Sequence, residues 1–276
     1  MSEILAVFSS PIFLWALLGG IAAALIGGTV GSLVVVRRIT FVSGSISHAL
    51  LAGAGLFLWL ERVWGIPYLT TFLGAIFASI ISALLIARAG KSVRFREDAV
   101  IATIWATGMA IGIVFIAKTP GYTTELTSLL IGNILWITKG EIALLFFLAF
   151  CCLLFTALYF QKLKLFAFDS DEAKLQGIST DTLYKQLLVL VAIAVVALTQ
   201  VVGIVLVLTM LTLPQLLASL FARSLASIII YATGISILCT CGGLILAFIL
   251  DWPAGASITL LSAGAYVIGL LASSRQ

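Results

Sequence analysis

The chain has 276 residues, of which 62% are hydrophobic and only 9% are charged, whereas an ordinary soluble domain has about 45–50% apolar and about 25% charged residues. A soluble domain of this length buries only about 75% of its surface, so a chain this apolar needs hydrocarbon around it. The composition excludes most soluble enzymes, disordered scaffolds and nucleic-acid-binding proteins. The net charge of +4 does not indicate a polyanionic partner, because the placement of basic residues in a membrane protein reflects its orientation in the membrane.

Long apolar runs predict eight membrane-spanning helices. A helix needs about 20 apolar residues to cross the hydrocarbon core of a bilayer. Runs of this kind, bounded by charges, Gly or Pro, cover about 12–36, 46–60, 67–88, 98–117, 141–160, 184–209, 225–249 and 254–272, the second being short. The alternation of polar and apolar residues expected of a membrane β-barrel is absent. The sequence therefore predicts an all-α, polytopic membrane protein.

One further stretch does not fit this pattern. Residues 125–138 read ELTSLLIGNILWIT and are too short and too polar to span a bilayer. Non-helical or half-helical backbone is tolerated at membrane depth where it lines a cavity. We expect this stretch to be a half-helix that enters the membrane beside a cavity.

The distribution of Lys and Arg predicts the orientation. Eight spans put both termini on one side, and cytoplasmic loops carry an excess of basic residues. If the N-terminus is outside, ten basic residues lie inside, namely Arg37, Arg38, Arg88, Lys91, Arg94, Arg96, Lys162, Lys164, Lys174 and Lys185. Five lie outside, namely Arg62, Lys118, Lys139, Arg223 and Arg275. Both termini are therefore predicted outside the cytoplasm, and the long loop at 161–185 inside.

Small residues recur every four positions in the first span, at Gly19, Ala23, Gly27 and Gly31. This spacing places them on one helical face, where a neighbouring backbone can approach closely. Packing between helices of the same chain is the preferred interpretation, and an interface between subunits is the alternative.

His48 is the only histidine, and it stands inside the second apolar run, FVSGSISHALLAGAG. That run interleaves serines with glycines, which is typical of a helix that lines a path rather than one that faces lipid. The simpler interpretation of His48 is a neutral imidazole hydrogen-bonded to a carbonyl. The sharper one is a ligand for a transition-metal ion in transit, because neutral imidazole binds such ions and a conduit needs a weak site.

Other chemistry is not indicated. Gly90-Lys91-Ser92 resembles the end of a phosphate-binding loop, but that motif needs Gly at position 85, which is Leu85. The sequence has no HExxH or GxSxG motif and no carboxylate pair within a span. We therefore expect no nucleotide site and no catalytic residues in this chain.

Six segments are informative together. In chain order they are RRITFVSGSISHALLAGAG (37–55), Glu97-Asp98, IGNIL (131–135), FDSDEAKLQGI (168–178), VGIVLVLTMLTLP (202–214) and DWPAGASITL (251–260). They resemble the permease subunits of bacterial ABC importers for zinc, manganese or iron, the family called ABC-3. Each segment is weak alone, but six in order over nearly the whole chain make a specific match.

The resemblance implies that residues 1–276 form a single transmembrane permease domain of the bacterial plasma membrane. It implies a complex of two permease copies, a cytoplasmic ABC ATPase that hydrolyses ATP, and an extracytoplasmic metal-binding protein. The cargo would be a divalent metal ion, with no permanently bound cofactor. The resemblance also assigns ATPase contact to the loop at 161–185, through Phe168, Asp169, Asp171, Ala173 and Gly177.

The chain departs from the family pattern at Gly44, where members of the family usually have Asp four residues before the histidine. Positions four apart share one helical face, so that Asp would join the histidine in holding a cation. His48 is carried over as a metal ligand and the carboxylate is not. Ser45 or a backbone carbonyl is the candidate substitute.

Two other functions stay open on the sequence alone. The loss of the carboxylate leaves room for an ABC permease that takes a siderophore or a vitamin, although such permeases generally have more spans. From a different class, the chain could be a membrane scaffold or assembly factor without a conduit. The choice between zinc, manganese and iron also stays open.

Overall fold

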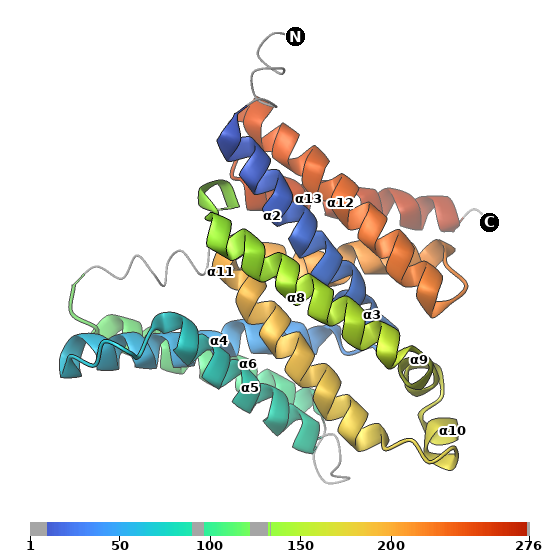
Figure 1. Ribbon diagram of the computed structural model, residues 1–276, viewed down its shortest axis with the longest axis horizontal. Coiled ribbons are helices and arrows are strands. Elements are labelled where there is room, and N and C mark those ends of the chain that lie inside the picture. The colour runs from blue at the N-terminus through green and yellow to red at the C-terminus, as the bar shows by residue number, and fades with distance from the viewer. Residues whose placement is uncertain (1–9, 90–96, 122–131, 133, 275–276) are drawn as a thin grey trace.

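The computed structural model describes residues 10–89, 97–121, 132 and 134–274, and every regular element within these ranges is a helix (Figure 1). Eight helices are long and apolar enough to cross a membrane, which confirms the predicted fold class. In chain order they are α2 (Pro11–Ile26) continued through the π-helical turn η1 (Gly27–Gly31) into α3 (Ser32–Val36), α4 (Thr40–Trp64), α5 (Thr71–Ala89), α6 (Glu97–Lys118), α8 (Lys139–Leu158), α11 (Thr180–Phe221), α12 (Leu225–Leu250) and α13 (Ala254–Ser273). Three short helices complete the fold: the 3₁₀ turn η2 (Ile134–Trp136), α9 (Phe160–Phe168) and α10 (Ser170–Leu175).

Local sequence signals fix several helix ends. The Ser10 hydroxyl accepts a hydrogen bond from the Phe13 N–H, and Pro11 occupies the first helical position, where its missing N–H costs nothing. Capping boxes begin α8 and α12, at Thr138 and Ser224 respectively. Because these signals are local, the sequence defines these helix starts well.

The second span is longer than predicted. Helix α4 covers Thr40–Trp64, whereas the apolar run suggested only 46–60. The extra N-terminal residues include Ser43 and Ser45, which are fully buried and whose hydroxyls donate to carbonyl oxygens of Thr40 and Ile101 respectively. Polar residues satisfied in this way can lie in a span that packs against protein on most sides, so hydropathy underestimates its length.

The predicted span at 184–209 is wrong in extent, because α11 runs for 42 residues and is interrupted at Gly203, whose φ of 78° and ψ of 162° are not helical. A straight helix of that length would be about 63 Å long, roughly twice the hydrocarbon thickness. Yet Thr180 at its start shares a pocket with Phe166, and Arg223 just after its end shares another with Phe168. Both ends of α11 therefore lie beside α9, and the chain reverses direction at Gly203.

This reversal changes the predicted sidedness. Arg223 lies at the end of the bundle where α9 and α10 lie, not opposite to it. Helix α13 then runs beside the second half of α11, because Gly255 lies against Leu206 and Gly269 against Leu217. The start of α2 and the end of α13 consequently lie at opposite ends of the bundle (Figure 1), so the prediction of two termini on one side is wrong for these helix ends.

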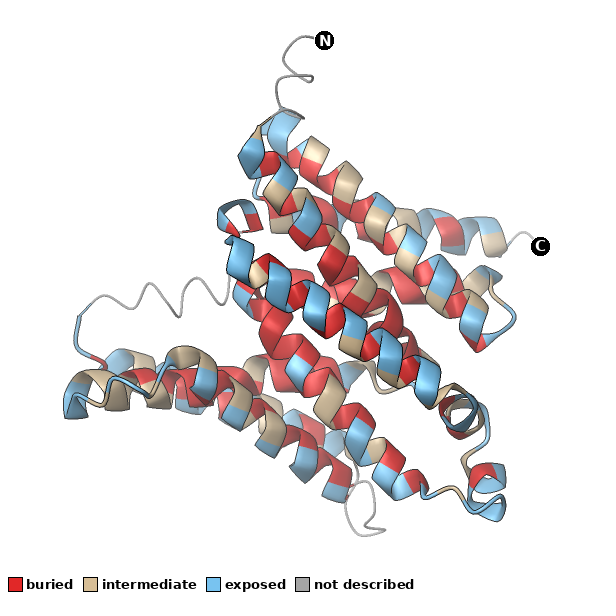
Figure 2. Ribbon diagram, in the orientation of Figure 1, coloured by how far each residue is buried: buried red, intermediate tan, exposed pale blue. Residues whose placement is uncertain are grey.

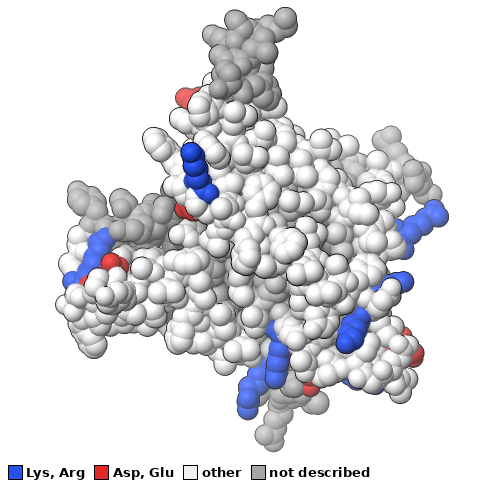
Figure 3. All heavy atoms as spheres, viewed as in Figure 1, with Lys and Arg blue, Asp and Glu red and all other residues white. Residues whose placement is uncertain are grey.

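Close helix contacts hold the bundle together, with α11 at its centre (Figure 2). A Cβ atom added to Gly27 or Gly31 would lie 2.6 or 2.7 Å from the carbonyl oxygen of Met210 or Leu211. The glycines of the first span therefore allow α2 and η1 to pack directly on α11, which confirms the prediction of packing within the chain. Figure 3 shows the charged side chains near the ends of the helices, with a broad uncharged surface between them.

The half-helix predicted for 125–138 falls largely outside the described residues. The described part consists of the isolated Gly132, the 3₁₀ turn Ile134–Trp136, and residues 137–138, which lead into α8. Gly132 has a φ of 67°, and a Cβ atom there would lie 2.2 Å from the carbonyl carbon of Val202. Backbone therefore packs on backbone beside the interruption of α11.

Candidate functional site

The interruption of α11 at Gly203, which we call the α11 break, lines a cavity of about 590 Å³. Its wall is formed by His48 of α4, by Gly132 and η2, by the residues on both sides of Gly203, and by the turn between α12 and α13. No Asp or Glu is present among the described residues that line it. We call this space the break cavity.

The α11 break interrupts a helix beside this wall. A helix end leaves its last carbonyl groups without intrahelical donors. Such backbone is tolerated within a membrane protein where protein or a cavity surrounds it. Val202 and Ile204, on either side of Gly203, both line the break cavity. The wall therefore combines His48 with the residues on both sides of a helix interruption.

His48 is half-buried, and its ring stacks on the indole of Trp105 from α6, with 4.8 Å between centroids and 16° between planes. Its Nδ1 atom is buried and has no hydrogen-bond partner among the described residues. A carbonyl that accepts from this nitrogen, as in the simpler interpretation of His48, is therefore absent from the described part of the chain.

The structure separates Ser45 from His48, and it shows what lies beside Gly44, the position without the family's carboxylate. Gly44 lies one turn before His48 and also faces Trp105, since a Cβ atom on Gly44 would lie 2.9 Å from Cζ3 of that indole. Ser45 is fully buried, does not line the break cavity, and donates its hydroxyl to the Ile101 carbonyl at 2.9 Å. Ser45 thus joins α4 to α6 and does not reach the cavity that His48 lines.

The predicted ATPase-contact segment forms two short helices rather than an open loop, and its last residues, from Thr180, belong to α11. Asp169 is the N-cap of α10, where its Oδ1 accepts from the N–H groups of Asp171 and Glu172. Phe168, Asp169, Asp171 and Gly177 are exposed, but Ala173 is fully buried. Ala173 is therefore a packing residue of α10, and the other four are accessible.

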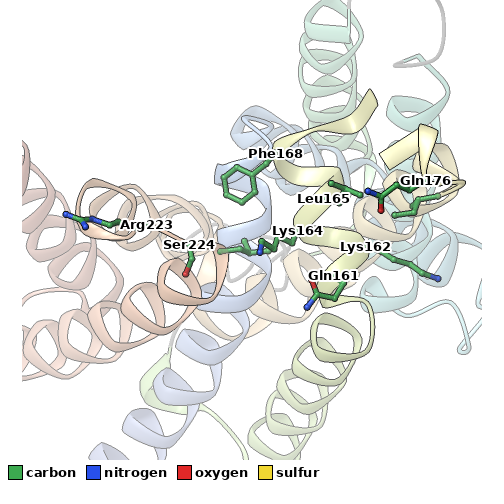
Figure 4. A pocket seen from close by; sticks show the side chains of 10 residues that line it. Gln161, Lys162, Lys164, Leu165, Phe168, Gln176, Arg223 and Ser224 are labelled. Carbon is green, nitrogen blue, oxygen red and sulfur yellow. The ribbon is translucent and has the colours of Figure 1, made fainter. Parts of the chain in front are cut away.

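A second, open cavity of about 580 Å³ adjoins this segment. It lies between α9 and the start of α12, with Phe168, Leu165 and Lys164 on one side and Ser224 on the other (Figure 4). An apolar floor with basic neighbours, exposed at the end of the bundle, suits contact with another protein surface.

Arg37 connects this segment to the spans. Its Nη1 atom donates to the Phe166 carbonyl at 2.9 Å, and its guanidinium lies 4.0 Å from the centroid of the Phe166 ring. Burial lowers the pKa of Arg37, while its electrostatic interactions with Tyr184 and Glu97 oppose that shift, and the guanidinium stays cationic at neutral pH. The Tyr184 hydroxyl in turn donates to the Glu97 carboxylate. The end of α3, the start of α6 and the start of α11 therefore meet at α9.

Three of these features were not predicted: Trp105, the α11 break and the link through Arg37. Trp105 stands in a run of small residues and carries no motif. Gly203 has apolar neighbours on both sides, so no polar turn signal marks the reversal. Arg37 belongs to a segment that the sequence does single out, but its contact with α9 bridges 129 positions of the chain.

A profile of the ABC 3 transport family matches residues 9–273. The chain is 37% identical to a Chlamydia trachomatis protein named "Probable metal transport system membrane protein", over 98% of this chain and 92% of that one. It is 28% identical to the "Manganese transport system membrane protein MntC" of Halalkalibacterium halodurans, over 95% of this chain and 87% of that one.

Among solved structures, the fold is similar to "PsaBC from Streptococcus pneumoniae in complex with Fab", with a TM-score of 0.83 and 26% identity. The match covers 97% of this chain and 94% of that chain. The family profile covers nearly all of the sequence, and the chlamydial relative matches at nearly full length. The chain belongs to the ABC 3 transport family.

Proposed function

We propose that the chain is the permease subunit of an ATP-driven importer of a divalent transition-metal ion, and that the ion passes His48. The observation that carries this proposal is the break cavity, where an imidazole faces the interrupted backbone of a central helix. Interrupted helices line the cargo sites of many transporters because their freed carbonyls can coordinate cations. The names of the relatives, which include manganese and other metal transport systems, support the same cargo class.

A weak site suits this role. The described residues contain no group of three or more His, Cys, Asp or Glu side chains that could hold a metal ion tightly. Conduction requires that an ion leave as readily as it enters, so one imidazole with backbone oxygens is sufficient for a transit site. A second copy of the permease, facing the first, would supply a second imidazole to the same path.

The orientation in the membrane follows from the charges. Among the described basic residues, only Arg62, Lys118 and Lys139 lie at the end of the bundle opposite α9 and α10. The positive-inside rule therefore makes the α9–α10 end cytoplasmic and the start of α2 extracytoplasmic. In this arrangement the ATPase docks on α9 and α10, and a metal-binding protein delivers the ion at the opposite end. The permease itself hydrolyses no ATP, and the complex resides in the plasma membrane.

Growth rescue tests this proposal. A bacterial strain without its own manganese, zinc and iron importers receives the complete complex with wild-type, His48→Ala or Ser47→Ala permease, and grows on each metal as the limiting nutrient. Ser47 is the matched control, since its buried hydroxyl bonds only within α4. We expect rescue by wild type and Ser47→Ala for at least one metal, and its loss with His48→Ala. Absence of rescue by the wild type, or full rescue by His48→Ala, would contradict the proposal.

A further inference from the structure

We propose that Trp105 is a positioning residue that sets which ions the His48 site accepts, an inference that rests on the proposed metal transport. The indole of Trp105 holds the imidazole in the wall of the break cavity, and it also fills the space that a carboxylate side chain at position 44 would need. The site is thereby restricted to an imidazole and backbone oxygens.

The geometry places one indole over two positions of α4. Gly44 and His48 are one helical turn apart and so share a face. The His48 ring stacks on Trp105 at 4.8 Å between centroids. At Gly44, an added Cβ atom would lie 2.9 Å from Cζ3 and 3.1 Å from Cη2 of the same indole, and 3.6 Å from Leu208 on the other side. A side chain at position 44 therefore meets the edge of the indole, which has to move to admit it.

The backbone that carries the indole is fixed, because α6 packs closely against α4. A Cβ atom on Gly108 would lie 2.6 Å from the Ala49 Cα atom, and one on Gly112 would lie 2.9 Å from the backbone of Leu51. The hydrogen bond from Ser45 to the Ile101 carbonyl joins the same two helices near the start of α6. Trp105 projects from the helix turn directly before Gly108, so its position is set by this contact.

The set of donor atoms at this site determines which metal ions it prefers. Imidazole suits zinc and iron, whereas carboxylate and carbonyl oxygens suit manganese. The break cavity has His48 and no Asp or Glu among its described lining residues. We therefore expect the wild-type site, which has an imidazole and no carboxylate, to favour manganese less than the same site with a carboxylate would. A carboxylate at position 44 should shift that preference toward manganese, but only when the indole is removed.

Metal uptake by four permeases tests this coupling: wild type, Gly44→Asp, Trp105→Ala and the double variant. Uptake of radioactive manganese, zinc and iron is measured in cells with the complete complex and divided by the amount of complex that co-purifies with the ATPase. We expect Gly44→Asp alone to lose at least tenfold for every ion, because its side chain meets the indole. The double variant should recover uptake and show a manganese-to-zinc ratio at least threefold above wild type.

Two further variants separate positioning from general packing. Trp59→Ala removes an indole from the contact between α4 and α6 at a place away from His48. There the Trp59 ring lies 5.8 Å from the Phe115 ring of α6, measured between centroids. We expect it to leave the ion ratio unchanged. Trp105→Phe keeps a ring beside His48 and should retain more uptake than Trp105→Ala.

The outcomes distinguish the two proposals. If the wild-type complex moves none of the three ions, the proposed function fails. If the wild type moves an ion but Gly44→Asp alone is as active, or the double variant leaves the ratio unchanged, the role of Trp105 is overturned. An equal change of ratio in Trp59→Ala would also overturn it.

Discussion

At the scale of single residues, Gln215 shows how the fold accommodates a proline in its central helix. Pro214 lacks the N–H group that would donate to the Met210 carbonyl four positions earlier. The Nε2 atom of Gln215 donates to that carbonyl and to the Gly27 carbonyl in the π-helical turn of the first span, both at 2.7 Å. One fully buried amide therefore satisfies carbonyl oxygens of two helices.

Replacement of Gln215 by Leu, which has a similar volume, should leave both carbonyls without this donor. A buried unsatisfied polar group costs about 1–3 kcal/mol, so thermal unfolding of the purified protein in detergent should occur at a lower temperature than for wild type. Gln176→Leu is the control, because Gln176 is exposed and bonds only to Glu172 on the surface. Equal unfolding temperatures for the two variants would contradict this role for Gln215.

Asp169 offers a second prediction at this scale, because its cap of α10 and its proposed contact with the ATPase are separable. Asp169→Ala removes the cap, which is worth about 1 kcal/mol at a helix start, whereas Asp169→Ser keeps a capping oxygen and removes the charge. If α10 must be formed for docking, co-purification of the ATPase should fall with Ala and persist with Ser. Equal loss with both variants would instead assign the effect to the charge of Asp169.

At the scale of elements, the sequence predicts a helix correctly where the signal for it lies within the helix itself, and fails where the structure depends on contacts with distant helices. The apolar runs are local signals, so the existence of the spans and several of their starts were predicted correctly. The extent of α4 and the reversal of α11 depend on packing with distant helices, and both were mispredicted. The same reason explains why the sequence identified only part of the candidate site. His48 stands out because histidine is rare in a membrane span, whereas the role of Trp105 depends on its contact with α4.

The element that transmits motion is expected to be α9, through Arg37. The guanidinium joins the end of the first span to the Phe166 backbone and ring, so Arg37→Gln should lower metal uptake per ATP hydrolysed while the complex still assembles. Arg38→Gln is the matched control, because Arg38 is exposed. The measurement compares ATP hydrolysis and uptake in the same proteoliposomes. An unchanged ratio in Arg37→Gln would contradict a coupling role for this contact.

At the scale of the whole molecule, the reversal at Gly203 determines which helix ends share a side. The second half of α11 returns to the α9–α10 end of the bundle. Helices α12 and α13 therefore run in the opposite direction to the one they would have if α11 crossed the membrane only once. With Arg223 at the same end as the other basic clusters, the charge asymmetry is stronger than the sequence count suggested.

Cysteine labelling tests this arrangement. In a variant without the four native cysteines, Ser10→Cys lies at the start of α2 and Ser274→Cys just after α13. A membrane-impermeant maleimide added to intact spheroplasts should label Ser10→Cys, and should label Ser274→Cys only after the membrane is opened. Labelling of both positions in intact spheroplasts would show that α11 crosses the membrane once.

The central claim is that a metal ion crosses the membrane past His48 when ATP is hydrolysed. Its most direct test is ATP-dependent accumulation of radioactive zinc, iron or manganese in proteoliposomes that contain the purified complex, with the metal-binding protein supplied on the side opposite the ATPase. We predict accumulation by wild type and a reduction of at least tenfold with His48→Ala, at an unchanged amount of assembled complex. Accumulation by His48→Ala at the wild-type rate would contradict the claim.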